Sequence, residues 1–353
     1  MTAGTWEPAG DRDLRVGLIG LGVMGRNHLR VLDTLAGVRV VAVADPVELA
    51  LADAVAASGA QGYAEPLALL AEAELDAVII ASPTMTHLPL ALAAIERGLA
   101  VLVEKPLAAT PAEADTIVTA ANQRGVPLQV GHVERFNPAV LELGRLLDAG
   151  WLSTVYAITS RRGGPLPARI RDVGVTIDLA THDVDILCWV AAERPVRVTA
   201  ETAQRVHQDH EDLLFGLMRF PSGTVAMLDV DWLTPTKRRT LTVLGEEGMF
   251  ELDYLTQRLT FTRGTDVSEP ELLKGFAPTF TGESTELPVA GSEPLAAELA
   301  AFVQVVRRGG RPVVAGEDGR WAVVLADALI RSARDRRAID LDLDLDLDKT
   351  AVR

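Results

Sequence analysis

A glycine pattern near the N-terminus constrains the fold more than any other part of the chain. The apolar run at residues 14–19 predicts a buried strand, and Gly20-x-Gly22-x-x-Gly25 follows it directly, before a stretch with helical spacing. Glycines in this arrangement permit a tight turn and the close approach of a pyrophosphate to a helix N-terminus. The pattern alone is weak, but a strand before it and a helix after it are the context that a dinucleotide site requires.

An acidic residue supports the same interpretation. The second apolar run, residues 38–44, ends at Asp45, where the dinucleotide fingerprint expects a carboxylate for the ribose hydroxyls. Pro46 and Val47 follow, with no Arg, Lys or Ser to hold a 2′-phosphate, so NAD is expected rather than NADP. The cofactor contacts predicted in this region are Gly20, Gly22, Val23, Met24, Gly25 and Asp45.

Strand and helix patterns alternate through the first third of the chain. Apolar strands are predicted at residues 14–19, 38–44, 76–81, 100–103 and 127–130, with helical stretches between them. This βαβ alternation indicates an α/β fold with a doubly wound, parallel Rossmann sheet.

The pattern changes after about residue 132. Helices are predicted at residues 138–149 and 175–191, separated by a strand at 155–160 and a basic, Gly/Pro-rich loop at 161–173. Closely spaced strands then fill residues 196–263, which predicts an open, mainly antiparallel sheet in an α+β domain. Helices at 294–308 and 318–336 follow a loop-rich segment.

These patterns divide the chain into four parts. We expect a flexible leader at residues 1–12, an NAD-binding Rossmann domain at 13–131 and an α+β substrate and oligomerisation domain at 132–338. Residues 340–348 alternate Asp and Leu, and this charge density predicts that residues 339–353 form a disordered acidic tail.

Composition excludes several classes of function. The net charge of -15 argues against nucleic acid and anionic membranes as partners. A single cysteine and the lack of a signal peptide or long apolar span favour a cytoplasmic protein without disulfides. The histidines are scattered without a metal-ligand set, so no metal is predicted, and no Gly-x-Ser-x-Gly elbow supports a hydrolase.

Glu104-Lys105-Pro106 follows the predicted strand at residues 100–103. Pro106 holds Lys105 in an extended conformation, at the carboxyl end of a parallel strand where open α/β sheets bind ligands. We therefore expect Glu104 and Lys105 beside the cofactor; a solvated pair of charges at a strand end is the alternative.

The segment Ser82-Pro83-Thr84 also follows a predicted parallel strand, so it is expected to line the cofactor crevice. His87 is expected there as well, although an ordinary polar residue at a helix start explains it equally well.

An aspartate and a histidine in the second half of the chain form a candidate pair for proton transfer. Asp178 and His182 are four residues apart on a predicted helix, where they share one face. A carboxylate beside an imidazole can orient the ring for proton transfer. An ordinary helix-surface contact is the alternative reading of this pair.

Substrate contacts are expected from two further stretches. Arg135 and Asn137 lie at the change of domains, where ligands commonly bind. Arg169 and Arg171 belong to the basic loop, whose guanidinium groups suit a phosphate, although a charge-balancing surface loop would look the same.

Together, Gly20-x-Gly22-x-x-Gly25, Glu104-Lys105-Pro106 and Asp178-x-x-x-His182 resemble the Gfo/Idh/MocA family of oxidoreductases over about residues 14–336. The resemblance implies a Rossmann domain followed by an α+β domain with an open sheet, which often packs in homo-oligomers. It also implies oxidation or reduction of a sugar or cyclitol carbinol with a nicotinamide cofactor. The catalytic residues of the family map to Lys105, Asp178 and His182.

Residues 131–140 and 164–174 resemble the branch of UDP-N-acetylglucosamine 3-dehydrogenases. This likeness implies oxidation at C3 of a nucleotide sugar, with Lys105, Arg135, Asn137, Arg169, Arg171, Asp178 and His182 around the substrate. Either His182 or Lys105 would accept the hydroxyl proton. An inositol or free-sugar dehydrogenase of the same fold, or a nucleotide-sensing regulator without catalysis, are the alternatives.

Overall fold

The computed structural model describes residues 6–166, 173–264 and 282–342. The chain forms two compact units: Met1–Phe136 with Ser292–Asp327, and Asn137–Gly291 with Ala328–Arg353. Along the described ranges, no helix is long and apolar enough to cross a membrane.

The first unit is built on a six-stranded sheet with the order β3-β2-β1-β4-β5-β6, and all its pairs are parallel. This confirms the predicted Rossmann sheet. Its strands are β1 (Leu14–Ile19), β2 (Val38–Ala44), β3 (Gln61–Tyr63), β4 (Ala77–Ile80), β5 (Ala100–Glu104) and β6 (Leu128–Gly131). The β3 strand and the following α3 (Pro66–Glu72) were not predicted.

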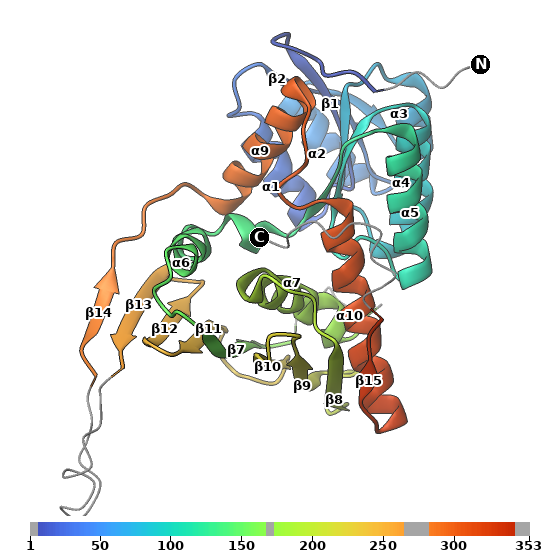
Figure 1. Cartoon of the computed structure of the whole chain (residues 1–353). Helices are drawn as coiled ribbons and strands as arrows, with labels where there is room; N and C mark the ends of the chain where they lie inside the picture. The colour runs from blue at the N-terminus through green and yellow to red at the C-terminus, as the bar shows by residue number, and fades with distance from the viewer. Residues whose placement is uncertain (1–5, 167–172, 265–281, 343–353) are drawn as a thin grey trace, which may run out of the picture. The chain divides into compact units, whose positions relative to one another are not determined.

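Helices cover both faces of this sheet (Figure 1). Apolar side chains of α3, α4 (His87–Glu96) and α5 (Pro111–Arg124) pack into one core. Those of α1 (Val23–Leu32), α2 (Glu48–Ser58) and α9 (Pro294–Arg308) pack into the other. The α9 helix was expected in the second domain; it belongs to the first unit because Leu299 and Phe302 enter the same core as Leu29 and Leu32.

Residues 6–12 are not a loose leader. The amides of Ala9 and Gly10 donate to the carbonyl oxygens of Val306 and Arg307 at the end of α9, at 2.9 and 3.0 Å. Arg12 forms an ion pair with Asp76 at 2.7 Å. These contacts fix the segment on the first unit, which sequence composition alone did not indicate.

The second unit contains a nine-stranded sheet with the order β14-β13-β12-β11-β7-β10-β9-β8-β15. Within the described strands of this second sheet, β7 and β10 are the one pair that is parallel, so the prediction of a mainly antiparallel sheet is confirmed. The strands are β7 (Val155–Gly163), β8 (Arg197–Ala203), β9 (Leu213–Arg219), β10 (Val225–Asp231), β11 (Arg238–Gly245), β12 (Gly248–Asp253), β13 (Arg258–Arg263), β14 (Ser284–Leu287) and β15 (Ile339–Asp340).

Helices α6 (Pro138–Asp148) and α7 (Thr181–Ala191) lie on one face of this sheet (Figure 1). The long α10 (Gly316–Asp335) precedes β15. The tail was predicted to be disordered from residue 339, but Ile339 and Asp340 pair with β8 and Ile339 is buried. Residues 343–353 of that tail lie outside the described ranges.

Candidate functional site

The turn between β1 and α1 packs tightly against the protein at Gly20 and Gly25 but leaves free space beside Gly22. Gly20 has a φ of +89°, and a Cβ atom there would lie 2.6 Å from the backbone of Ala81. A Cβ atom on Gly25 would lie 1.8 Å from the carbonyl oxygen of Gly20. At Gly22, which caps α1, a Cβ atom would meet nothing within 4 Å. The space left there fits the pyrophosphate of a dinucleotide at the helix N-terminus.

Asp45 follows β2 and contacts the same turn. Its carboxylate accepts hydrogen bonds from the amides of Leu21 at 2.7 Å and Val47 at 2.8 Å. The side chain remains partly exposed, and a carboxylate has further lone pairs that can accept from ribose hydroxyls. Val23 and Met24, in the first turn of α1, lie at the edge of this surface, with Val23 57% exposed.

Ser82, Pro83 and Thr84 follow β4, as expected for a segment at the cofactor edge of the sheet. The hydroxyls of Ser82 and Thr86 lie 2.7 Å apart, and residues Thr84–Thr86 form a short 3-10 helix. All three predicted residues are exposed or partly exposed, so they are open to a ligand.

His87 is buried within the protein. Its ring is 1% exposed, and its Nδ1 and Nε2 atoms each lie 2.9 Å from a carbonyl oxygen, that of Pro106 and that of Ser82 respectively. Burial lowers the pKa of the imidazole, which favours the neutral ring, and a neutral ring has one N–H with which to donate to one of these two carbonyls. His87 thus lies between the segments after β4 and β5, and its predicted cofactor contact stays a prediction.

Glu104 is also turned inward. Its carboxylate lies 2.7 Å from Nε2 of buried His28 and accepts a hydrogen bond from the Lys105 amide at 3.2 Å. These contacts give Glu104 partners within the protein, and its predicted contact with the cofactor stays a prediction. Lys105 itself is half-buried just past the carboxyl end of β5, and its peptide bond to Pro106 is cis.

The two residues expected at the domain change are used within the protein. The side chain of Asn137 caps α6 by accepting from the Ala139 amide at 3.1 Å, and it donates to the Tyr254 carbonyl at 3.3 Å. Arg135 is 3% exposed, with its guanidinium 4.0 Å from the carboxylate of Asp318. Both side chains thus have partners within the protein, and their predicted substrate contacts stay predictions.

Asp178 and His182 lie on one continuous helical stretch in the second unit. Asp178 belongs to a π-helical turn, Thr176–Ala180, and His182 to the first turn of α7. A π turn within a helix is often found at functional sites. The amide of Thr176 donates to Glu211 at 3.2 Å, which fixes the start of this turn. Both predicted residues are half-buried, and Lys105 is in the other unit.

The predicted arginine cluster is divided by the structure. Arg161 and Arg162 lie in β7 and not in a loop. Arg161 pairs with Asp229 at 3.1 Å, and buried Arg162 pairs with Asp183 at 2.7 Å. Arg169 and Arg171 lie outside the described residues, so their expected role as phosphate ligands stays a prediction.

Sequence analysis gave no site role to His28. A signal was available, because His28 lies three residues after Gly25 and both are buried on the same face of α1. Its partner Glu104 is 76 residues away, a separation that no local pattern reveals.

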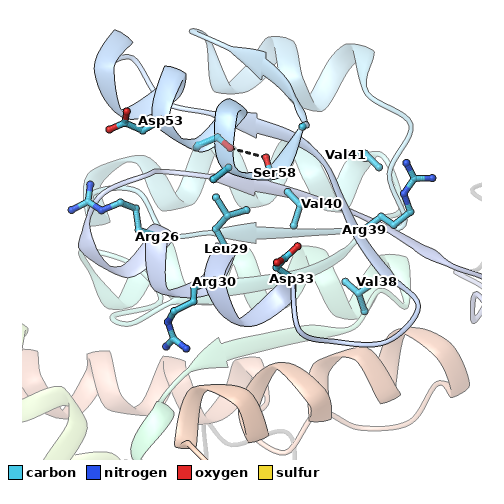
Figure 2. Close-up of a pocket in the computed structure, with 13 residues that line it drawn as sticks. Arg26, Leu29, Arg30, Asp33, Val38, Arg39, Val40, Val41, Asp53 and Ser58 are labelled. Atoms are coloured by element: carbon cyan, nitrogen blue, oxygen red, sulfur yellow. Dashed lines mark hydrogen bonds between the residues drawn. The ribbon is translucent and has the colours of Figure 1, made fainter.

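A groove of about 650 Å³ lies between α1, β2 and α2, and the residues that line it include none of the predicted site residues (Figure 2). Leu29, Val40 and Ala54 are among the residues that line it. Arg26 and Arg39 lie at opposite ends of it and do not converge on one point. Among the described side chains, no group of three or more His, Cys, Asp or Glu residues could hold a metal ion.

Two family models match the chain. Residues 14–132 match an oxidoreductase family with an NAD-binding Rossmann fold, and residues 140–251 match the GFO/IDH/MocA C-terminal domain.

Relatives with both sugar and cyclitol names are similar to the chain. The UDP-N-acetylglucosamine 3-dehydrogenase of Acidithiobacillus ferrooxidans is 31% identical over 90% of this chain and 95% of its own length. Inositol 2-dehydrogenase 2 of Saccharopolyspora erythraea is 36% identical, over 62% of this chain and 66% of its own length. The chain therefore spans just under two thirds of the length of this second relative.

A solved structure shares the fold of the whole chain. The WlbA dehydrogenase of Bordetella pertussis, in complex with NADH and UDP-GlcNAcA, superimposes with a TM-score of 0.83 at 25% identity, over 96% of this chain and 100% of that one. The open turn at Gly22 and the Asp45 carboxylate suit a dinucleotide, in agreement with the NAD-binding family model that matches the same residues. The chain belongs to the Gfo/Idh/MocA family of NAD-binding oxidoreductases.

Proposed function

We propose that this chain is an NAD-dependent dehydrogenase that oxidises a sugar ring hydroxyl to a ketone, at C3 of UDP-N-acetylglucosamine or a related nucleotide sugar. The observation that carries the substrate class is the 31% identity to a UDP-N-acetylglucosamine 3-dehydrogenase over nearly the whole chain. The ligands named for the WlbA structure, NADH and UDP-GlcNAcA, are of the same class. The open turn above Gly22 supports NAD as the cofactor.

In this proposal the protein residues orient the hydroxyl and remove its proton. NAD, when bound, accepts the hydride from the carbinol carbon. The hydroxyl proton passes to the imidazole of His182, because an imidazole with an ordinary pKa of about 6.5 can accept a proton near neutrality. Lys105 polarises the oxygen as a cation, and Asp178 orients His182. A Lys105 amine that accepts the proton is the alternative assignment.

An inositol or free-sugar dehydrogenase is the second candidate. The 36% identity to an inositol 2-dehydrogenase favours it, although over a shorter stretch. The two candidates differ in their need for the nucleotide, since a diphosphate site would bind UDP and a cyclitol site would not.

A panel of substrates separates these functions. Purified protein with NAD is offered UDP-N-acetylglucosamine, free N-acetylglucosamine, UDP-glucose and myo-inositol, and NADH is followed by absorbance. We expect turnover of the UDP sugars only, with mass spectrometry of the product locating the new ketone. Equal turnover of free N-acetylglucosamine would reject the nucleotide-sugar assignment. NAD binding without turnover of any compound would favour a sensing regulator.

Variants test the assigned residues. Lys105→Ala, Asp178→Asn and His182→Ala should each lower kcat by about 100-fold or more while the Kd for NAD stays near that of the wild type. Arg336→Ala, at an exposed site beyond the end of α10, is a matched control. Unchanged turnover in any of the three would remove that residue from the mechanism.

We further propose a cytoplasmic homo-oligomer that forms through the exposed face of the nine-stranded sheet, opposite α6 and α7. Phe215, Leu217, Met227 and Leu244 alternate with buried residues on their strands and are 42–49% exposed. Leu217 and Met227 are directly opposite in the β9–β10 pair, which makes an apolar patch. Leu217→Lys should lower the mass measured by light scattering, and Leu49→Lys, at an exposed site on α2, should not. A monomeric wild type would refute the proposal.

A further inference from the structure

Lys105 lies between two residues that are each held by a buried histidine. The carboxylate of Glu104, before it, is 2.7 Å from Nε2 of His28. The carbonyl oxygen of Pro106, after it, is 2.9 Å from Nδ1 of His87. The two histidines are 0% and 1% exposed and come from different helices, α1 and α4.

The Glu104 carboxylate occupies a closely fitted position. Gly131 pairs with Glu104 across β5 and β6, and a Cβ atom on Gly131 would lie 2.9 Å from the Glu104 carboxyl group. The second carboxylate oxygen accepts from the Lys105 amide at 3.2 Å. Glu104 therefore connects His28, on one helix, with the main chain of Lys105.

A donor such as His28 is needed because the carboxylate is only 7% exposed. A buried carboxylate without a hydrogen bond is strongly unfavourable. Glu298 of α9 is fully buried nearby, and burial together with the charge of Glu104 raises the pKa of the Glu298 carboxyl well above its usual range. The His28 N–H lies in position to stabilise the buried Glu104 carboxylate.

His87 holds the other side of Lys105. Its Nδ1 atom contacts the Pro106 carbonyl, and its Nε2 atom contacts the Ser82 carbonyl, also at 2.9 Å. In the tautomer that carries its proton on Nδ1, the neutral ring donates to the Pro106 carbonyl and so links the segment after β5 to α4.

We propose that His28 and His87 are positioning residues that hold the main chain of Lys105 from both sides, through the Glu104 carboxylate and the Pro106 carbonyl. This inference rests on the proposed role of Lys105 in catalysis. The buried rings act through Lys105: a displaced lysine loses its orientation toward the reacting oxygen. A displacement of about 1 Å can cost roughly 100-fold in rate.

Amide side chains can test the two ring nitrogens separately. The amide nitrogen of Gln approximates the position of imidazole Nε2, and that of Asn approximates Nδ1. His28→Gln should therefore keep the donor to Glu104, while His28→Asn should lose it. At His87 the expectation is the opposite. His87→Asn should keep the contact with the Pro106 carbonyl, while His87→Gln should keep only the contact with the Ser82 carbonyl.

With NAD and UDP-N-acetylglucosamine, we expect His28→Asn and His87→Gln to lower kcat by about 10- to 100-fold. His28→Gln and His87→Asn should stay close to the wild type, and the Kd for NAD should not change in the His28 variants. If the two histidines only filled space, the same substitution, either Asn or Gln, would give the higher kcat at both positions. That result in folded variants would overturn the proposal.

Gly131 offers a test that changes neither histidine. Gly131→Ala should displace the Glu104 carboxylate and lower kcat like His28→Asn. Gly164→Ala is the control, because its Cβ atom would meet its nearest neighbour at 3.5 Å, an ordinary contact. Wild-type kcat in Gly131→Ala would contradict the path through Glu104.

A second readout does not depend on turnover. The chain has only four lysines, Lys105, Lys237, Lys274 and Lys349, so methylation with ¹³C-formaldehyde gives few NMR signals. Lys105→Arg identifies the Lys105 signal. This signal should shift in His28→Asn and His87→Gln and stay in the other two variants; an unmoved signal in all four would overturn the inference. Full turnover in Lys105→Ala would instead refute the proposed role of Lys105 in catalysis while the NMR result on the histidines stands.

Discussion

Asp45 ties the end of β2 to the glycine turn, because its Oδ2 atom accepts a hydrogen bond from the Leu21 amide at 2.7 Å. Its Oδ1 atom accepts from the Val47 amide at 2.8 Å. The carboxylate is thus oriented before any ligand arrives. A group held in this way loses little conformational entropy when it binds a ribose.

Replacing Asp45 should weaken NAD binding. Asp45→Asn removes charge-assisted hydrogen bonds worth about 1.5–3 kcal/mol, so the Kd for NAD should rise by roughly 10-fold or more. Fluorescence titration with NADH measures this change. Asp53→Asn, an exposed site on the neighbouring helix α2, is the control. An unchanged Kd in Asp45→Asn would show that the carboxylate does not contact the ribose.

Two glycines of the turn should respond differently to alanine. Gly25→Ala places a Cβ atom 1.8 Å from the Gly20 carbonyl oxygen, and backbone cannot move aside cheaply, so the melting temperature should fall together with NAD affinity. Gly22→Ala meets no protein atom within 4 Å and should leave the melting temperature unchanged. It should still raise the Kd for NAD by about tenfold, since the methyl group fills the space for the pyrophosphate. If the two variants changed the melting temperature equally and the Kd for NAD equally, this distinction would be refuted.

Sequence periodicity predicted the elements whose own residues determine them. The apolar runs of β1 and β2 lie between residues that break strands, and their predicted bounds match the structure. The β3 strand was not predicted because it has three residues, one of them glycine, and pairs only through its neighbour β2. Ile339 and Asp340 likewise form a strand only because β8 offers an edge.

The candidate site shows the same difference between residues that are close in sequence and residues that packing brings together. Gly20, Gly22, Gly25 and Asp45 are close in sequence, and a spacing rule locates them. His28 with Glu104, and Arg162 with Asp183, are pairs formed by packing between distant segments. A local pattern could therefore assign charges to Glu104 and Arg162 but could not identify their partners.

Arg162 and Asp183 form a buried ion pair that should dominate the stability of their surroundings. Their side chains are 2% and 1% exposed, and Asp183 also accepts from the Ser160 hydroxyl at 2.5 Å. Arg162→Met leaves a buried carboxylate without its cation, which should cost about 3–5 kcal/mol in the free energy of unfolding by urea.

Arg258→Met is the control for that measurement. Arg258 pairs with Glu286 at 2.7 Å, but the side chains are 60% and 58% exposed, so its loss should cost about 0–1 kcal/mol. Equal losses in the two variants would show that burial does not set the strength of the Arg162 pair.

Glu298 should make the stability of the chain depend on pH. Both of its carboxylate oxygens are buried without a hydrogen bond among the described residues, and burial with the charge of Glu104 raises the pKa of this group well above 4.5. The folded state then binds a proton that the unfolded state releases. This group's contribution to stability is complete below about pH 4.5 and is lost as the pH rises toward the raised pKa, at about 1.4 kcal/mol per pH unit.

Glu298→Gln removes that titration, so the variant should gain stability relative to the wild type as the pH rises above 4.5. Urea unfolding at a series of pH values measures the difference between the two proteins, in which the other titrating groups cancel. Glu293→Gln is the control with the opposite sign, because its hydrogen bond with Arg30 lowers the pKa of the Glu293 carboxyl. A Glu298→Gln difference that stays flat with pH would mean that the buried carboxyl does not titrate in this range.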